Sequence, residues 1–149
     1  MNNLVSITDV IAQKHPDIMG YVKAFSNDLA DNEFKPRIMY DIGESVGRKI
    51  FLSKYQTLKM DDSIGQALKK IVLPTITPFS LAKIKENEIH VSVCPFCIHI
   101  KETASSVQCD FLSGLICGLI SPKQQVNVVE VQCRAQKHPA CVFLVNKKY

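Results

Sequence analysis

The chain of 149 residues is 46% hydrophobic and 21% charged, proportions typical of a soluble globular protein, which exclude the disordered and fibrous classes. Its net charge of +4 comes from lysines scattered among acidic residues, a pattern that favours a solvated surface over a nucleic-acid-binding face. The length suits a single domain over 1–149, with a helical part over about 1–75 and a sheet part over about 76–149.

The first half of the chain shows the spacing of amphipathic helices. Apolar residues three or four positions apart predict one helix over about 16–31 and a second over about 36–54. On the second helix, Gly43 and Gly47 lie one turn apart, where the lack of side chains lets another backbone or a ligand approach closely. Tight packing against another helix is the simpler of these two interpretations.

The segment MDDSIGQALKKIVLP, residues 60–74, predicts a third helix. Asp61 or Asp62 is the expected N-terminal cap, and Pro74 is the expected stop. The apolar stripe of this helix consists of Ile64, Leu68 and Ile71. With this helix the helical part of the chain is expected to end.

After the third helix, the apolar residues change from a helical to a strand-like period. Alternation predicts a β-hairpin over 79–94 and two further strands over about 126–133 and 141–146. Between them, the helix predicted over 105–121 contains FLSGLICGLI, which is apolar on most sides and should be deeply buried. This order predicts an α+β fold, with an antiparallel sheet of two hairpins packed against N-terminal helices and one buried central helix.

Neither a signal peptide nor a membrane span is expected. The N-terminus MNNLVSITDVIAQKH lacks a basic segment followed by a long apolar one, and FLSGLICGLI is too short to cross a bilayer, so a cytoplasmic location is expected. The six cysteines should then be reduced thiols that serve as metal ligands, redox groups or core residues. Cys117, in the middle of the buried helix, is expected to be a core residue.

Two cysteines flank the loop between the last two strands. Cys133 ends one predicted strand and Cys141 begins the next, so pairing of the strands would bring the two thiols together. Glu130 lies three residues before Cys133, on the opposite face of a regular strand, so a shared metal ion requires a bulge or twist. Cys109 is the best candidate for a further ligand, because free N–H groups near the start of a helix favour a thiolate. A water molecule or His138 could replace Glu130.

The stretches CDFLSGLICGLIS and VVEVQCRAQKHPACVFLV resemble the carboxy-terminal half of the four-vinyl reductase domain. That family shows a cysteine at the start of a glycine-punctuated apolar helix, then E-x-x-C, a loop, and C-x-F on the last strand. RIMYDIGESVGRKI also resembles its upstream Gly-x-x-x-Gly helix. The resemblance implies that Cys109, Glu130, Cys133 and Cys141 bind one zinc ion, which four protein ligands would make structural.

The resemblance also implies a function. The family includes the sensor half of aromatic-responsive transcription factors, so we expect a sensor or carrier that binds a hydrophobic small molecule, a hydrocarbon or an aromatic compound. The alternatives are an assembly subunit similar to trafficking-complex proteins and an enzyme of tetrapyrrole vinyl reduction. The chain shows neither a glycine-rich dinucleotide loop nor a nucleophile–base pair, which disfavours the enzyme.

The expected ligand lies between the helical layer and the sheet. The side chains expected to contact it are those of Tyr40, Phe111, Leu115 and Ile116. A homodimer is the expected assembly, and no direct binding of nucleic acid is expected.

The motif CPFC, with Cys94 and Cys97 at its ends, resembles the active site of glutaredoxin-like oxidoreductases. Such enzymes place a helix directly after the motif, whereas residues 98–100 continue a strand-like alternation. Packed thiols are therefore the preferred interpretation. A zinc site made of Cys94, Cys97, Cys133 and Cys141 is the alternative.

Overall fold

The structure is a computed structural model, and it describes residues 35–77, 80–94 and 109–148. In chain order, the elements of these residues are α3 (Lys35–Lys54), α4 (Ile64–Ala67), the π-helical η1 (Leu68–Val72), α5 (Leu73–Ile76), β1 (Leu81–Lys85), β2 (Glu88–Val93), α6 (Asp110–Ile120), β3 (Val126–Gln132), the 3₁₀ turn η3 (Arg134–Gln136) and β4 (Cys141–Lys147). The second predicted helix and both hairpins are confirmed. The predicted first helix lies outside the described residues.

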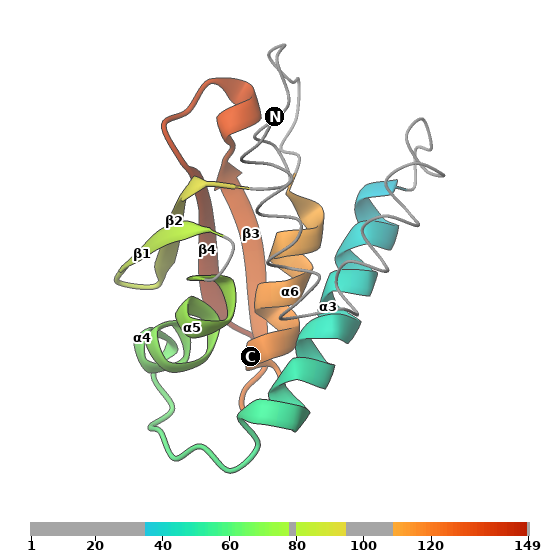
Figure 1. The fold of residues 1–149 in the computed structure, drawn as a ribbon, viewed down its shortest axis with the longest axis vertical. Coiled ribbons are helices and arrows are strands. Elements are labelled where there is room, and N and C mark those ends of the chain that lie inside the picture. The colour runs from blue at the N-terminus through green and yellow to red at the C-terminus, as the bar shows by residue number, and fades with distance from the viewer. Residues whose placement is uncertain (1–34, 78–79, 95–108, 149) are drawn as a thin grey trace.

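The sheet has four antiparallel strands in the order β1-β2-β4-β3, so the second hairpin joins the first through β4. Figure 1 shows α6 against this sheet and α3 on the side of α6 that faces away from the strands. Alternation along β3 buries Val126, Val128 and Glu130 and exposes the residues between them. The predicted α+β fold is therefore confirmed for the described part of the chain.

Two pairs of glycines let the backbones of α3 and α6 touch. A Cβ atom added to any of the four would overlap a backbone carbonyl oxygen of the other helix. The glycines and the residues that supply these oxygens are Gly43 with Phe111, Gly47 with Leu115, Gly114 with Tyr40, and Gly118 with Glu44. The interpretation of Gly43 and Gly47 as residues of a tight helix contact is therefore confirmed, and α6 carries the matching pair.

The third helical segment differs from its prediction at both ends. Its cap is Ser63 and neither aspartate, because the Ser63 hydroxyl accepts a hydrogen bond from the Gln66 N–H at 3.1 Å. Pro74 does not end the segment, since it lies in the first turn of α5, after the π-helical turn η1. Helical dihedrals continue through Val72 and Leu73, so Pro74 comes just after a π-helical turn, an irregularity at which a helix accommodates a residue that cannot donate a backbone hydrogen bond.

The centre of the hydrophobic core is α6. Every residue from Phe111 to Ile120 is buried, as its continuous apolar pattern predicts. Its side chains belong to one cluster with Ile89 of β2 and Phe143 of β4, so the helix holds the middle of the sheet in place. Among the helices in the described ranges, none combines the length and the apolar character that a membrane crossing needs.

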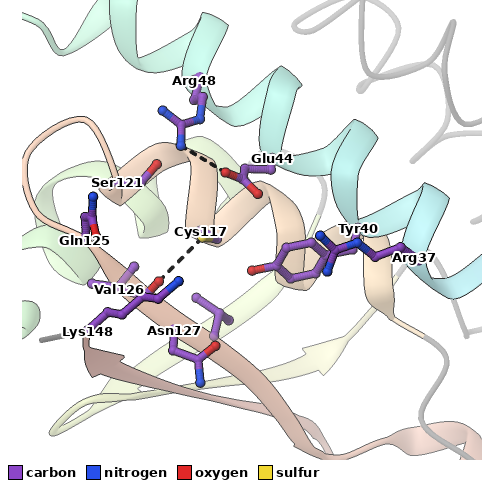
Figure 2. A pocket seen from close by; sticks show the side chains of 11 residues that line it. Arg37, Tyr40, Glu44, Arg48, Cys117, Ser121, Gln125, Val126, Asn127 and Lys148 are labelled. Atoms are coloured by element: carbon purple, nitrogen blue, oxygen red, sulfur yellow. Dashed lines mark hydrogen bonds and ion pairs between the residues drawn. The ribbon is translucent and has the colours of Figure 1, made fainter.

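A cleft of about 520 Å³ opens beside α3, at the end of α6 that lies away from Cys109 (Figure 2). Helix α3 forms one wall, and the end of α6 and the start of β3 form the others. The residues lining it are Arg37, Tyr40, Glu44, Arg48, Cys117, Ser121, Gln125, Val126, Asn127, Val128 and Lys148.

Candidate metal centre

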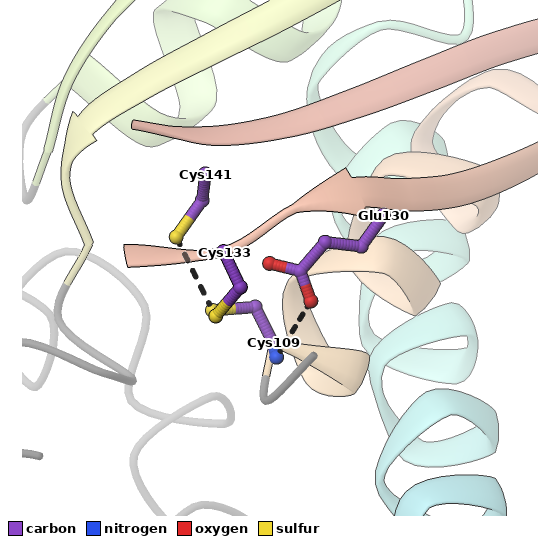
Figure 3. A group of neighbouring side chains, drawn as sticks. All are labelled: Cys109, Glu130, Cys133 and Cys141. Carbon is purple, nitrogen blue, oxygen red and sulfur yellow. Dashed lines mark hydrogen bonds between the residues drawn. The ribbon is translucent and has the colours of Figure 1, made fainter. Parts of the chain in front are cut away.

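Three thiols and one carboxylate meet where α6 begins, beside the loop that joins β3 to β4 (Figure 3). Cys109 is the N-cap residue of α6, Glu130 lies on β3, Cys133 follows β3, and Cys141 begins β4. All four residues are buried, and their ligand atoms lie within 4.8 Å of one another. The structure therefore brings together the four residues that the resemblance implied, in a group that can hold a metal ion.

An irregularity in β3 turns Glu130 and Cys133 to the same side of the sheet. The register of the pairing between β3 and β4 shifts between Glu130 and Gln132. As a result Val131 is 47% exposed, while Glu130 and Cys133 on either side of the irregularity are buried. This register shift meets the condition of a bulge or twist that a shared metal ion would require.

Hydrogen bonds from the main chain fix the loop between the two cysteines. The Gln136 N–H donates to the Cys133 carbonyl oxygen at 2.9 Å, and Lys137 takes a left-handed conformation with φ of 70° that closes the turn. The Arg134 N–H donates to the Cys141 sulfur at 3.4 Å. Because a hydrogen bond to the charged form of a group favours that form, this contact stabilises the thiolate, the form that binds metal.

Glu130 links the hairpin to the start of α6. Its Oε1 atom accepts a hydrogen bond from the Cys109 N–H at 2.9 Å. Its Oε2 atom is buried and has no hydrogen-bond partner within the described ranges. A buried polar atom without a partner costs free energy, and a coordinated cation is one way to remove that cost.

The thiol of Cys94 lies next to the group of four. Cys94 is fully buried directly after β2, and its sulfur lies 3.2 Å from that of Cys109. The sulfurs of Cys109 and Cys141 lie 3.7 Å apart. Cys97 and the segment 98–100, on which the redox and alternative zinc interpretations depend, lie outside the described residues.

Because Glu130 can gain or lose a proton, the stability of the metal-free protein and that of the metal-loaded protein should change with pH in opposite directions. Burial raises its pKa from 4.5 to about 7, against the lowering effect of the Cys109 N–H. The metal-free folded chain thus holds this proton more tightly than the unfolded chain does. The resulting stabilisation, about 3 kcal/mol, is complete below pH 4.5 and is lost as the pH rises through about 7. Metal ligands must lose their protons, so metal binding strengthens as the pH rises.

Urea denaturation at about pH 5 and about pH 8 should therefore show opposite changes in stability for the EDTA-treated and the metal-loaded protein. The EDTA-treated protein should lose stability at the higher pH, and the metal-loaded protein should gain it. The control is Glu130→Gln, a neutral side chain of similar shape, which should remove most of the loss in the EDTA-treated protein. The same change of stability with pH in the EDTA-treated and the metal-loaded protein would contradict metal binding by Glu130.

The other residues predicted for the two sites lie in different surroundings. His138 is exposed and is not among the four residues of the metal group. Phe111, Leu115 and Ile116 are 2%, 0% and 0% exposed and belong to the core. Tyr40 is half-buried and lines the cleft, where Cys117 also lies.

Sequence reasoning missed most of the charged residues around Tyr40. Arg37, Glu44 and Arg48 line the same cleft, and with Tyr40 they follow one another on α3 at steps of three, four and four. That spacing marks one polar face of a helix, and it could have been found beside the apolar stripe.

Known proteins resemble this chain in sequence and in fold. No protein-family model matches it. An uncharacterized protein of Methanocaldococcus jannaschii is 29% identical over 112 residues, which are 72% of this chain and 62% of that protein. The chain thus spans less than two thirds of the length of this relative.

Two solved structures have the same fold. The phenol-responsive sensory domain of the transcription activator PoxR matches with a TM-score of 0.61 and 15% identity, over 89% of this chain and 74% of that one. A vinyl-4-reductase family protein from Methanocaldococcus jannaschii matches with a TM-score of 0.58 and 19% identity, over 98% and 92%. The chain therefore has the fold implied by its resemblance to the four-vinyl reductase domain.

Proposed function

We propose that this chain is a small-molecule-binding sensor domain of the four-vinyl reductase family, stabilised by one structural zinc ion. The observation that carries the proposal is the convergence of Cys109, Glu130, Cys133 and Cys141 in a domain with the fold of a phenol-responsive sensory domain. The four ligands come from the start of α6 and from both strands of the last hairpin. Coordination by all four would fasten the sheet to its central helix.

The donor set and its spacing fit zinc. Thiolates and a carboxylate are common zinc ligands, and two thiolates on one tetrahedral zinc ion lie about 3.8 Å apart, given a Zn–S distance of about 2.3 Å. The sulfurs of Cys109 and Cys141 are 3.7 Å apart. Four protein ligands fill the tetrahedron, so the zinc has no open position for a substrate and its role is structural.

The ligand is proposed to be an aromatic or hydrocarbon compound. Its support is the fold shared with the phenol-responsive domain. Tyr40, which lines the cleft, is proposed to contact the polar group of the ligand, whereas Phe111, Leu115 and Ile116 are buried in the core and do not line the cleft. A homodimer is proposed as the unit that would carry a signal.

Native mass spectrometry of untreated protein tests zinc, ligand and oligomer together. We expect one zinc ion per chain, a dimer, and a co-purified or added small molecule. A thermal-shift panel of aromatic, fatty and tetrapyrrole-like compounds on the zinc-loaded protein should raise the melting temperature with at least one class, because a ligand that binds only the folded state stabilises it. No shift with any class would contradict the sensor function and favour an assembly subunit.

A further inference from the structure

One polar face of α3 forms the wall of the cleft beside it. Arg37, Tyr40, Glu44 and Arg48 all line the cleft from this face (Figure 2). The volume of about 520 Å³ falls within the range of about 300–1,000 Å³ typical of small-molecule sites. Since Val126 and Val128 also line the cleft, it offers a small apolar surface next to the polar groups.

Positive charge exceeds negative charge among the lining residues. Arg37, Arg48 and Lys148 are cationic, whereas Glu44 is the one carboxylate among them. Glu44 accepts a hydrogen bond from the Arg48 guanidinium at 2.9 Å, which leaves the other donors of that group available. Both arginines are paired, Arg37 with Asp41 and Arg48 with Glu44, but the side chain of Arg37 is 78% exposed against 51% for Arg48, which makes Arg48 the stronger candidate for a ligand contact.

Two of the residues that line the cleft, Tyr40 and Cys117, carry a hydroxyl and a thiol. The Cys117 thiol donates to the Val126 carbonyl oxygen at 3.7 Å. Burial raises the pKa values of both Tyr40 and Cys117. Both groups therefore stay neutral at physiological pH, so neither adds a negative charge, and the hydroxyl remains a donor.

We infer that this cleft binds a small organic acid, an apolar body bearing a carboxylate or phosphate group, with the acidic group near Arg48, Lys148 and the Tyr40 hydroxyl. Guanidinium groups match the geometry of both anions and form strong charge-assisted hydrogen bonds with them. This inference rests on the proposed function, because it gives the ligand of that function a place and a charge. The site is separate from the metal group, since Cys109 and Cys117 are eight residues, or about 12 Å, apart along α6.

Isothermal titration of the zinc-loaded full chain with four matched probes tests the charge of the ligand. Benzoate and phenyl phosphate carry the two acidic groups, benzamide is a neutral analogue of benzoate, and inorganic phosphate lacks the apolar body. Benzoate or phenyl phosphate should bind at least about tenfold more tightly than benzamide and inorganic phosphate. Added salt should weaken this binding, because the contacts are electrostatic and partly exposed.

Variants that remove either a positive or a negative charge from the cleft test the place of binding. Arg48→Gln should weaken binding of the preferred acid by about tenfold, and Glu44→Gln should strengthen it by removing the competing carboxylate. Lys148→Gln, at an exposed position that folding should tolerate, should also weaken it. The control is Lys85→Gln on β1, which removes the same charge from an exposed residue outside the cleft and should leave binding unchanged.

Each outcome decides between the cleft and the broader function. Equal binding of benzoate and benzamide, unaffected by these variants, would overturn the cleft assignment and leave the proposed sensor function standing. If inorganic phosphate binds and neither benzoate nor phenyl phosphate does, the inference that the ligand is an organic acid would be overturned. Failure of all four probes would overturn the inference, and the wider thermal-shift panel would then decide separately whether the sensor function survives.

Discussion

Replacing Gly114 by alanine should lower the free energy of unfolding by about 3 kcal/mol. The added Cβ atom would overlap the Tyr40 carbonyl oxygen and approach the Glu44 nitrogen at 3.0 Å. Both atoms belong to the backbone of α3, so no side chain can rotate away, and the two helices must separate. The separation would loosen the buried contacts of α6, the centre of the core. Urea denaturation followed by circular dichroism measures the change.

The matched control is Gly65→Ala in α4. A Cβ atom there meets only the Glu86 carbonyl oxygen, at an ordinary distance of 4.0 Å. Alanine is favoured over glycine in a helix by up to about 1 kcal/mol, so this variant should be neutral or more stable. The same substitution thus has opposite effects at Gly114 and Gly65. A Gly114→Ala protein as stable as the wild type would contradict the close contact of α3 and α6.

Cys133→Ser and Cys141→Ser should each lose the bound zinc and much of the stability. A missing thiolate leaves the ion under-coordinated, and zinc binding is coupled to folding. At free zinc about 100 times the dissociation constant, a bound ion adds about 2.7 kcal/mol to stability, and tighter binding adds more. Elemental analysis and thermal denaturation measure the two losses. EDTA should lower the melting temperature of the wild type and leave both variants nearly unchanged.

Two other cysteines provide controls for this experiment. Cys117→Ser alters a buried thiol outside the metal group, and Cys94→Ser alters the thiol that lies 3.2 Å from Cys109. Both variants should keep about one zinc ion per chain. Full zinc content in Cys133→Ser and Cys141→Ser would sink the ligand assignment, whereas loss of zinc in Cys94→Ser would favour the alternative set with Cys94. Glutathione-dependent disulfide reduction by the wild type would contradict the interpretation of the CPFC motif as non-catalytic.

The sequence alone predicted the local elements, and its resemblance to the four-vinyl reductase domain implied the members of the metal group. The apolar spacing of α3 and the alternation of the four strands depend on residues within a few positions of one another, so they can be read from the sequence. The pair Cys133 and Cys141 follows from the same local logic, because a hairpin brings the ends of adjacent strands together. Glu130 could be included only on the condition of a bulge, and the register shift after Glu130 meets that condition.

The tertiary structure decided the features that depend on distant parts of the chain. Pro74 was predicted to end a helix, but its position after a π-helical turn made it the start of the next one. The placement of β4 beside β2 and of Cys94 beside Cys109 could not be derived from any local spacing. The polar cleft likewise joins α3 to residues 69 or more positions later in the chain. Such contacts depend on which apolar faces bury one another, a choice made by the packing of the whole core, so sequence periodicity predicts the faces but not their partners.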